Sequence, residues 1–281
     1  MVTLCTYQLP KVSARDSTYE NCDPLNIGRV MIFDENQKIY GLVIKAETQI
    51  GALRKISELA EKLNIIIRYI QFSMTKIIEP SVTAIAFLDF SKSNVSPEEA
   101  LKLVKKLEFV KMAKLIKPHK KGIIFDDYFF PLNVGEERAV IFRKTVYEAL
   151  MEGVREKFGS AGEAILYYIG FTIGYQVCDR NLKIAHSKDA EDLINLSKAM
   201  FKTFGYGIID NAKIDFKEAR AQLRIHHNFE CGLGKNNGKP HSQFVRGILA
   251  GFFTQIFGKS VNAQETKCLA KGNSYCEFTI K

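Results

Sequence analysis

The sequence predicts an α+β protein of two domains, and three patterns lead to this prediction. Between residues 39 and 118, apolar spacings typical of strands and helices follow one another in the order βαββαβ. From 136 to 281, helical patterns precede strand patterns joined by turns, which favours an antiparallel sheet with helices beside it. The chain of 281 residues is 46% hydrophobic and 25% charged, which suffices for two cores.

The first domain follows an N-terminal extension, residues 1–38, for which we predict no function. Ser96 has the form of a helix cap, with Pro97 in the first turn and Glu99 able to reach back to the cap. The order of elements predicts a ferredoxin-like fold. Its expected elements are a strand at 40–46, a helix with Leu53, Ile56, Leu59 and Leu63 on one face, strands at 65–74 and 81–91, a helix at 98–107 and a strand at 110–117.

The second domain follows a connector at 119–135, which is too apolar to be a free linker and should pack on one of the domains. Glycines four residues apart, Gly170 with Gly174 and Gly247 with Gly251, predict helices whose backbones approach closely. The expected elements are helices at 136–158, 160–178 and 187–204, an antiparallel strand pair at 206–216 and 219–231, and a hairpin with strands at 261–269 and 275–280.

The final hairpin carries a spacing typical of a metal site. Glu265, Cys268 and Cys276 surround a predicted turn at residues 271–274, and Cys231 ends an earlier strand. Thiolates and a carboxylate suit zinc, whose structural sites are four-coordinate. Regular alternation would put Glu265 and Cys268 on opposite faces of their strand, so a shared ion requires a bulge.

Two other states of these cysteines remain open from the sequence. Cys268 and Cys276 can be buried free thiols or can form a disulfide, although few intracellular proteins keep disulfides. His227 and His241 are the alternatives to Cys231 as the fourth ligand. Strand alternation over 219–231 predicts that His227 is buried and that His226 faces the other way.

The C-terminal residues resemble a 4-vinyl reductase domain. The resemblance lies in the run 244–253 and in Glu265, Cys268, Gly272 and the segment 276–278, and covers about 136–281. The family includes a bacteriochlorophyll-biosynthesis protein, the sensor half of phenol-responsive transcription activators, archaeal proteins and a vesicle-tethering relative. In the phenol sensors three cysteines and one glutamate hold zinc beside an aromatic-ligand pocket. The resemblance therefore implies zinc ligation by Cys231, Glu265, Cys268 and Cys276.

The N-terminal domain resembles an ACT domain, a regulatory module that typically binds amino acids at its first strand-to-helix loop. Gly51 matches the glycine of that loop, whereas Gln49 and Ile50 replace the acidic residue and the proline that are usual there. The resemblance implies an amino-acid effector and pairing of two subunits as a homodimer. The effector loop would consist of Thr48, Gln49, Ile50, Gly51, Ala52 and Leu53.

The net charge of +9 is concentrated in one segment, which carries eight lysines and one acid, Glu108, between Lys102 and Lys121. Such a segment can bind nucleic acid, but the absence of interleaved arginine residues favours a solvated helix face and a protected strand edge. Neither a signal peptide nor an apolar stretch long enough for a bilayer is evident, so we expect a cytoplasmic protein without a membrane partner.

The function we expect is a regulatory protein that senses a small hydrophobic or aromatic ligand and possesses no enzymatic activity. The glycine-rich loop 232–240 is not a P-loop because Pro240 stands where Ser or Thr is needed, and no nucleophile with its base is evident. Rival hypotheses are an accessory protein or enzyme for a hydrophobic or tetrapyrrole substrate, and a dimeric scaffold. The candidate ligand-binding residues, which can equally be plain core, are Tyr167, Tyr168, Phe171, Tyr175, His227, Phe244 and Phe252.

Overall fold

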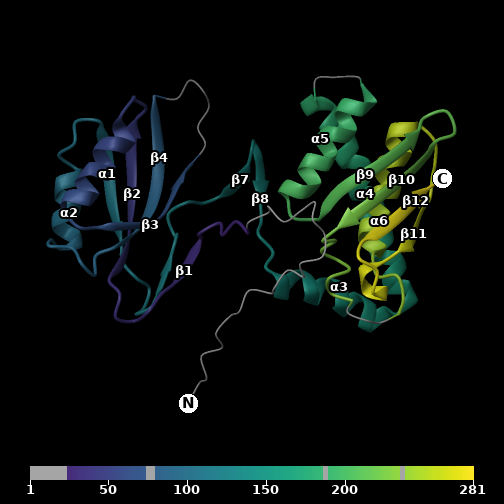
Figure 1. Ribbon diagram of the computed structural model, residues 1–281, viewed down its shortest axis with the longest axis horizontal. Helices are drawn as coiled ribbons and strands as arrows, with labels where there is room; N and C mark the ends of the chain where they lie inside the picture. The colour runs from purple at the N-terminus through teal and green to yellow at the C-terminus, as the bar shows by residue number, and fades with distance from the viewer. Residues whose placement is uncertain (1–23, 74–79, 186–188, 235–237) are drawn as a thin grey trace, which may run out of the picture. The chain divides into compact units, whose positions relative to one another are not determined.

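The structure, a computed structural model, describes residues 24–73, 80–185, 189–234 and 238–281 and divides into two compact units (Figure 1). The first unit ends at Ala139 and the second begins at Val140, a few residues after the predicted start of the second domain. Each unit combines helices with a four-stranded antiparallel sheet, so the chain is an α+β protein, as predicted. None of the helices in the described ranges combines the length and apolarity needed to span a bilayer.

The first unit has the predicted ferredoxin-like arrangement. Its sheet has the strand order β3-β4-β2-β5, and helices α1 and α2 pack on one face. The predicted capping box forms, since Ser96 and Glu99 each accept a hydrogen bond from the other's backbone N–H. These elements are β2 (Ile39–Glu47), α1 (Ala52–Lys62), β3 (Ile66–Phe72), β4 (Ser81–Asp89), α2 (Pro97–Val104) and β5 (Val110–Ile116).

The connector covers the opposite face of this sheet. A short strand pair, β1 (Val30–Ile32) with β6 (Ile123–Phe125), lies there together with Tyr128 and Phe129. Ile124, Val43 and Phe87 are fully buried between these layers. The apolar connector therefore packs on the first unit, as its composition indicated.

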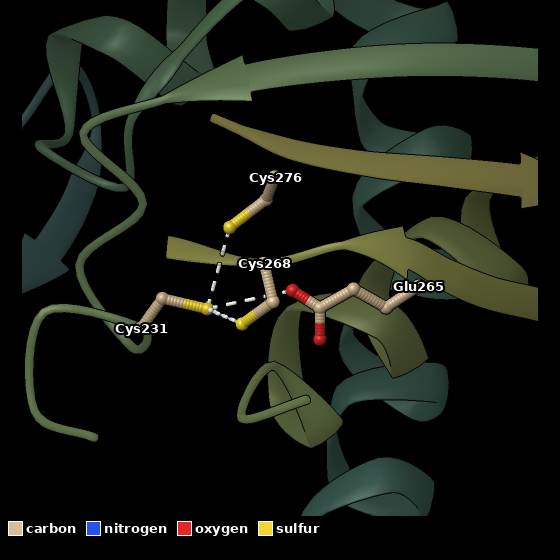
Figure 2. Close-up of side chains that lie close together, drawn as sticks. All are labelled: Cys231, Glu265, Cys268 and Cys276. Carbon is tan, nitrogen blue, oxygen red and sulfur yellow. Dashed lines mark hydrogen bonds between the residues drawn. The ribbon is translucent and has the colours of Figure 1, made fainter. Parts of the chain in front are cut away.

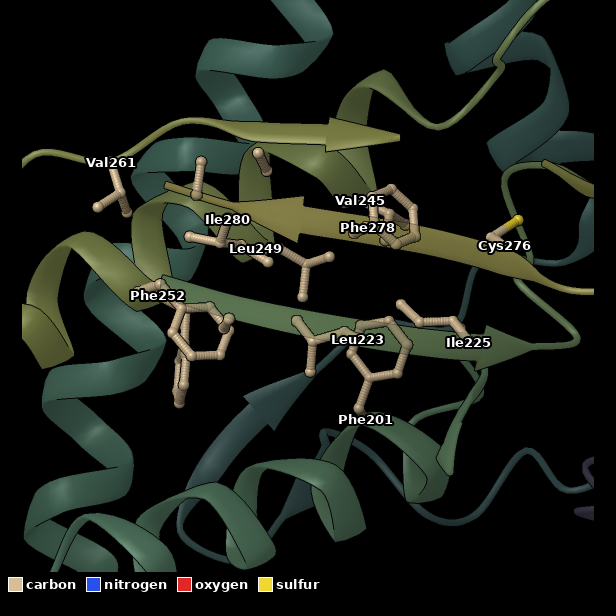
Figure 3. Close-up of a cluster of buried hydrophobic side chains, with 14 of the residues drawn as sticks. Phe201, Leu223, Ile225, Val245, Leu249, Phe252, Val261, Cys276, Phe278 and Ile280 are labelled. Atoms are coloured by element: carbon tan, nitrogen blue, oxygen red, sulfur yellow. The ribbon is translucent and has the colours of Figure 1, made fainter. Parts of the chain in front are cut away.

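Within its described residues, the second unit consists of the sheet β11-β12-β10-β9 and four α-helices. Its core lies between the sheet and α5 and α6, where alternate apolar side chains of β10 and β12 point inward (Figure 3). Burial of each such leucine, isoleucine or phenylalanine stabilises the fold by roughly 1.5–3 kcal/mol. The elements are α3 (Lys144–Phe158), α4 (Ser160–Ala185), α5 (Ala190–Thr203), β9 (Ile208–Asp215), β10 (Arg220–His226), α6 (Gln243–Phe257), β11 (Ala263–Lys267), the 3-10 turn η1 (Leu269–Lys271) and β12 (Cys276–Ile280).

The glycine pairs bring α4 and α6 into backbone contact, as predicted. A methyl group on Gly170 would stand 2.1 Å from the carbonyl oxygen of Phe244, and one on Gly247 would stand 2.0 Å from that of Tyr167. Real Cβ contacts are essentially never this short. Only glycine permits the observed separation of the two helices.

Several predicted boundaries were wrong. The helix predicted from 136 begins at Lys144, because residues 137–139 form β8 and pair with β7 (Leu132–Val134) across Gly135, whose φ is +60°. Helix α4 continues past residue 178 to Ala185. Met74 and Ser187, where we predicted a strand end and a helix start, lie outside the described residues.

Candidate metal centre

Four side chains from two segments of the second unit converge on one point (Figure 2). Cys231 lies in the turn after β10, Glu265 on β11, Cys268 at the start of η1 and Cys276 at the start of β12. Their ligand atoms all lie within 4.8 Å of one another. The Cys231 sulfur is 3.2 Å from that of Cys268 and 3.3 Å from that of Cys276, too far for a disulfide bond.

Local irregularities of the hairpin produce this convergence. The pairing of β11 with β12 shifts register between Glu265 and Lys267, which is the bulge that a shared site requires. The turn then closes at Gly272, whose φ of +89° favours glycine, and the side chain of Asn273 accepts a hydrogen bond from the N–H of Cys268 at 3.0 Å. The bulge places Glu265 and Cys268 on the same side of the hairpin.

Ser242, immediately before α6, links two of the four side chains. Its hydroxyl donates to Glu265 Oε1 at 2.9 Å and lies 2.7 Å from the Cys231 sulfur, and its N–H donates to Glu265 Oε2 at 3.2 Å. The N–H of Leu269 donates to the Cys276 sulfur at 3.4 Å. Sequence reasoning missed Ser242, although its position just before a helix is where polar side chains are common.

The four groups cannot all ionise together. Burial, followed by hydrogen bonding to Cys268, raises the pKa of Glu265 to about 7. Hydrogen bonds with Cys268 and Cys276 raise the pKa of Cys231, whereas the bond with Cys231 lowers the pKa of Cys268. When Cys268 is ionised, the neighbouring Cys231 therefore stays protonated. A bound cation would compensate these charges and displace the protons.

The donor set fits a divalent metal ion. Three sulfurs and one carboxylate oxygen match the ligands and the coordination number of structural zinc. Sulfurs around a tetrahedral zinc are roughly 3.8 Å apart, close to the separations found here. All four positions would be filled by protein atoms, which is the arrangement of a structural rather than a catalytic ion.

A buried ion pair fixes the backbone beside this cluster. Glu230 is fully buried, and its carboxylate accepts hydrogen bonds from the N–H groups of Phe244 and Val245 at the start of α6. Arg155 of α3 forms a salt bridge with it and also donates to the carbonyl of His241. Burial raises the pKa of Glu230 to about 7, and its hydrogen bonds oppose that rise. The pair therefore ties α3 to the turn that carries Cys231.

An open depression of about 590 Å³ lies beside Cys231. Tyr147 and Phe229 form an aromatic wall with their rings 5.6 Å apart. The ring centroids of Phe229 and Phe244 are 6.3 Å apart, so Phe229 joins this wall to the core. The residues that line the depression are Lys144, Tyr147, His227, Asn228, Phe229, Cys231, Gly232, Leu233, Leu269 and Ala270.

Of the seven candidate ligand residues, only His227 lines this depression in the described part of the chain. Phe252 is buried in the core, and Tyr167, Phe171 and Phe244 pack partly against that core. Tyr168 and Tyr175 are 68% and 43% exposed. A ligand-binding role for this set stays a prediction.

The two adjacent histidines lie opposite to their predicted positions. We expected the alternation of β10 to bury His227 and to turn His226 outward. Instead β10 ends at His226, which is buried beside Asp210 with its Nε2 3.0 Å from the carboxylate. His227 adopts a left-handed φ of +52° and is exposed. His241, the other alternative ligand, contacts Glu152 at 2.9 Å and lies outside the four-residue cluster.

The candidate sites of the first unit lie at its surface. In the predicted effector loop, Gly51 precedes α1 with a φ of +85° and Ile50 is fully exposed. The lysines between Lys102 and Lys121 are all exposed and occupy α2, the edge strand β5 and the loops beside them. Lys111 pairs with Glu47 at 3.3 Å, as expected of a solvated sheet edge. Amino-acid binding, nucleic-acid binding and subunit pairing stay predictions.

The C-terminal part of the chain matches a known protein family. Residues 221–281 match the family model of the 4-vinyl reductase domain. The chain is 31% identical to the uncharacterized protein MJ0150 of Methanocaldococcus jannaschii over 137 residues, which cover 49% of this chain and 74% of that protein.

Solved structures also resemble this chain. The phenol-responsive sensory domain of the transcription activator PoxR, solved with phenol, is 14% identical with a TM-score of 0.47, and the match covers 53% of this chain and 78% of that one. A vinyl-4-reductase family protein from M. jannaschii is 20% identical with a TM-score of 0.32, and the match covers 51% of this chain and 98% of that one.

Proposed function

Because the chain belongs to the 4-vinyl reductase domain family, with the family's domain at its C-terminus, we propose that its second unit is a small-molecule-binding regulatory domain organised by zinc. Cys231, Glu265, Cys268 and Cys276 hold the ion, which has a structural role. The depression beside Cys231 receives the ligand. The unit performs no catalytic step of its own.

The observation that supports this proposal most strongly is the double role of the turn that carries Cys231. That residue belongs to the four-residue cluster, and the same turn supplies Asn228, Phe229 and Gly232 to the wall of the depression. An ion bound to Cys231 would therefore fix one wall of the ligand site. The volume of about 590 Å³ lies within the range of small-molecule sites.

The chemistry of the lining indicates the class of ligand. Tyr147 and Phe229 offer aromatic faces, while Lys144 and His227 offer hydrogen-bond donors nearby. A monocyclic aromatic compound that carries a hydroxyl or carboxylate group satisfies both features. The proposal therefore takes phenol and benzoate as probes.

The proposal is tested by isothermal titration of phenol and benzoate into the full chain, before and after zinc removal. We expect saturable binding of at least one probe to the zinc-loaded protein, at least tenfold weaker after zinc removal. Phe229→Ala should weaken binding to a similar degree, whereas Tyr168→Ala, which alters an exposed ring outside the depression, should not. The proposal would be contradicted if the affinity for the probe changed neither on zinc removal nor in Phe229→Ala, or if it fell in Tyr168→Ala.

The proposed output of the domain is regulation of transcription, for which the lysine segment from Lys102 to Lys121 supplies exposed cations. Binding of duplex DNA should then fall steeply with salt. Replacement of Lys105, Lys106, Lys120 and Lys121 by glutamate should abolish it. Retention of DNA after this reversal would remove the transcriptional part of the proposal and would leave ligand binding untouched.

A further inference from the structure

Helix α1 of the first unit leaves its apolar face incompletely packed. None of its eleven residues is buried, and Leu53 is 48% exposed although it belongs to the apolar face. Helix α2 packs on the same sheet face and buries Ala100 and Val104. The part of the sheet face under α2 is therefore tightly packed, whereas the part under α1 is not.

The space beneath α1 is a cavity of about 200 Å³. Alanines form the middle of its floor, with Ala84 and Ala86 of β4 beside Ala46 of β2, and Ala60 contributes from the helix. Larger side chains of the same strands complete the floor: Leu42, Ile44, Val82 and Leu88. Larger apolar side chains along β3, including Ile70 and Phe72, line one side and are partly exposed, so the cavity opens toward solvent there. The volume lies where three helix-facing positions, Ala46, Ala84 and Ala86, carry alanine in place of the larger β-branched residues common in strands.

The lining selects against water and against charged ligands. Among its described residues only Glu47, Thr48 and Gln49 are polar, and all three lie at the loop between β2 and α1. Glu47 already pairs with Lys111. An apolar cavity of this kind does not hold water stably, and one of about 150 Å³ binds benzene. No side chain within the described lining is cationic, so none can form an ion pair with the carboxylate of an amino acid.

We propose that the first unit binds a small uncharged apolar molecule between α1 and the sheet. The cavity suits an aliphatic or monocyclic hydrocarbon of roughly ten non-hydrogen atoms. A single polar end of the ligand would lie near Thr48 and Gln49. The loop predicted to bind an amino acid thus becomes the mouth of an apolar site, independent of the depression in the second unit.

The test uses n-butylbenzene as the probe and the full chain, with binding measured by calorimetry and by nuclear magnetic resonance shifts of α1. We expect saturable binding that Ala84→Leu, which fills the cavity, weakens at least tenfold. Thr83→Leu adds the same kind of side chain to the other face of β4 and should bind normally. Ala60→Leu fills the cavity from the helix and serves as the second filling variant, so that one misfolded variant leaves the test intact.

Three results would overturn this inference. The first is no saturable binding, or binding that neither Ala84→Leu nor Ala60→Leu weakens. The second is binding of free L-leucine or L-phenylalanine in place of butylbenzene. The third is a dimer in which a second copy covers Leu53, Ile70 and Phe72 and excludes the probe. Zinc removal should leave butylbenzene binding unchanged, whereas it should weaken the binding of phenol or benzoate to the second unit. The two proposals can therefore fail independently.

Discussion

Gly174 of α4 lies against the main chain of Ile248 in α6, where a methyl group on the glycine would stand 2.0 Å from the carbonyl oxygen. Gly251 makes the corresponding contact with Phe171 from the other helix. Because α6 begins directly after Ser242, which is hydrogen-bonded to Glu265, the separation of these helices also positions the metal centre.

Substitution of Gly174 by valine should destabilise the second unit by about 3 kcal/mol or more, because the obstruction is backbone and cannot rotate away. Urea unfolding of the full chain measures the change. Gly153→Ala is the matched control, since Gly153 lies in α3 with open space around its Cβ position. That control should gain about 0.5–1 kcal/mol. If Gly174→Val lowered the free energy of unfolding no more than Gly153→Ala does, the close packing of α4 on α6 would be contradicted.

Removal of Arg155 should be costly because it leaves Glu230 buried without its charged partner. We expect Arg155→Met to lower the free energy of unfolding by about 3–5 kcal/mol, and Arg155→Met with Glu230→Gln to recover much of that loss. Arg54→Met, which breaks the exposed Arg54–Glu58 pair, should cause no measurable change. A double variant no more stable than the single one would show that the buried charge is not the cause.

Asp89 should make the first unit sensitive to acid. Burial alone would raise its pKa, but hydrogen bonds from Ser91 and Arg68 lower the pKa below its ordinary value. Because the folded pKa lies below the unfolded one, this stabilisation is complete above about pH 4 and is lost as the pH falls further. The wild type should have a higher free energy of unfolding than Asp89→Asn at pH 6, and this difference should shrink toward pH 3. A difference that stays constant with pH would argue against this role.

Ser242 should tune metal affinity without binding the ion. Its contacts with Cys231 and Glu265 orient both ligands, so Ser242→Ala should weaken zinc binding by roughly 10–100-fold in competition with a chelator. Ser274→Ala, in the exposed hairpin turn, should leave the affinity unchanged. Equal affinities of the two variants would contradict an orienting role for Ser242.

Local patterns were sufficient to predict much of the fold and the closeness of Glu265, Cys268 and Cys276, whereas Cys231 lies far from them in the sequence and had His227 and His241 as alternatives. The spacing of Glu265, Cys268 and Cys276 with strand alternation already required a bulge, and the structure contains it. The glycine pairs likewise indicated close helices before α4 and α6 were seen to touch. These features depend on residues near one another in sequence or on a single repeated spacing.

Features that depend on tertiary placement were not predictable in the same way. The sequence contained no sign that His227 would turn left-handed and end β10, so the inward and outward histidines were exchanged. Lys144 and Tyr147 reach the depression only because α3 packs beside the Cys231 turn. The cavity under α1 exists because small alanine side chains from distant parts of the chain meet there. The periodicity of apolar residues does not reveal such a meeting.

X-ray absorption at the zinc edge tests most directly whether Cys231, Glu265, Cys268 and Cys276 hold one divalent ion. The measurement uses full chain reconstituted with zinc under reducing conditions, together with metal analysis. We predict one zinc per chain with three sulfurs at about 2.3 Å and one oxygen at about 2.0–2.2 Å. Protein that retains no stoichiometric zinc, or zinc with two or fewer sulfur ligands, would contradict this prediction.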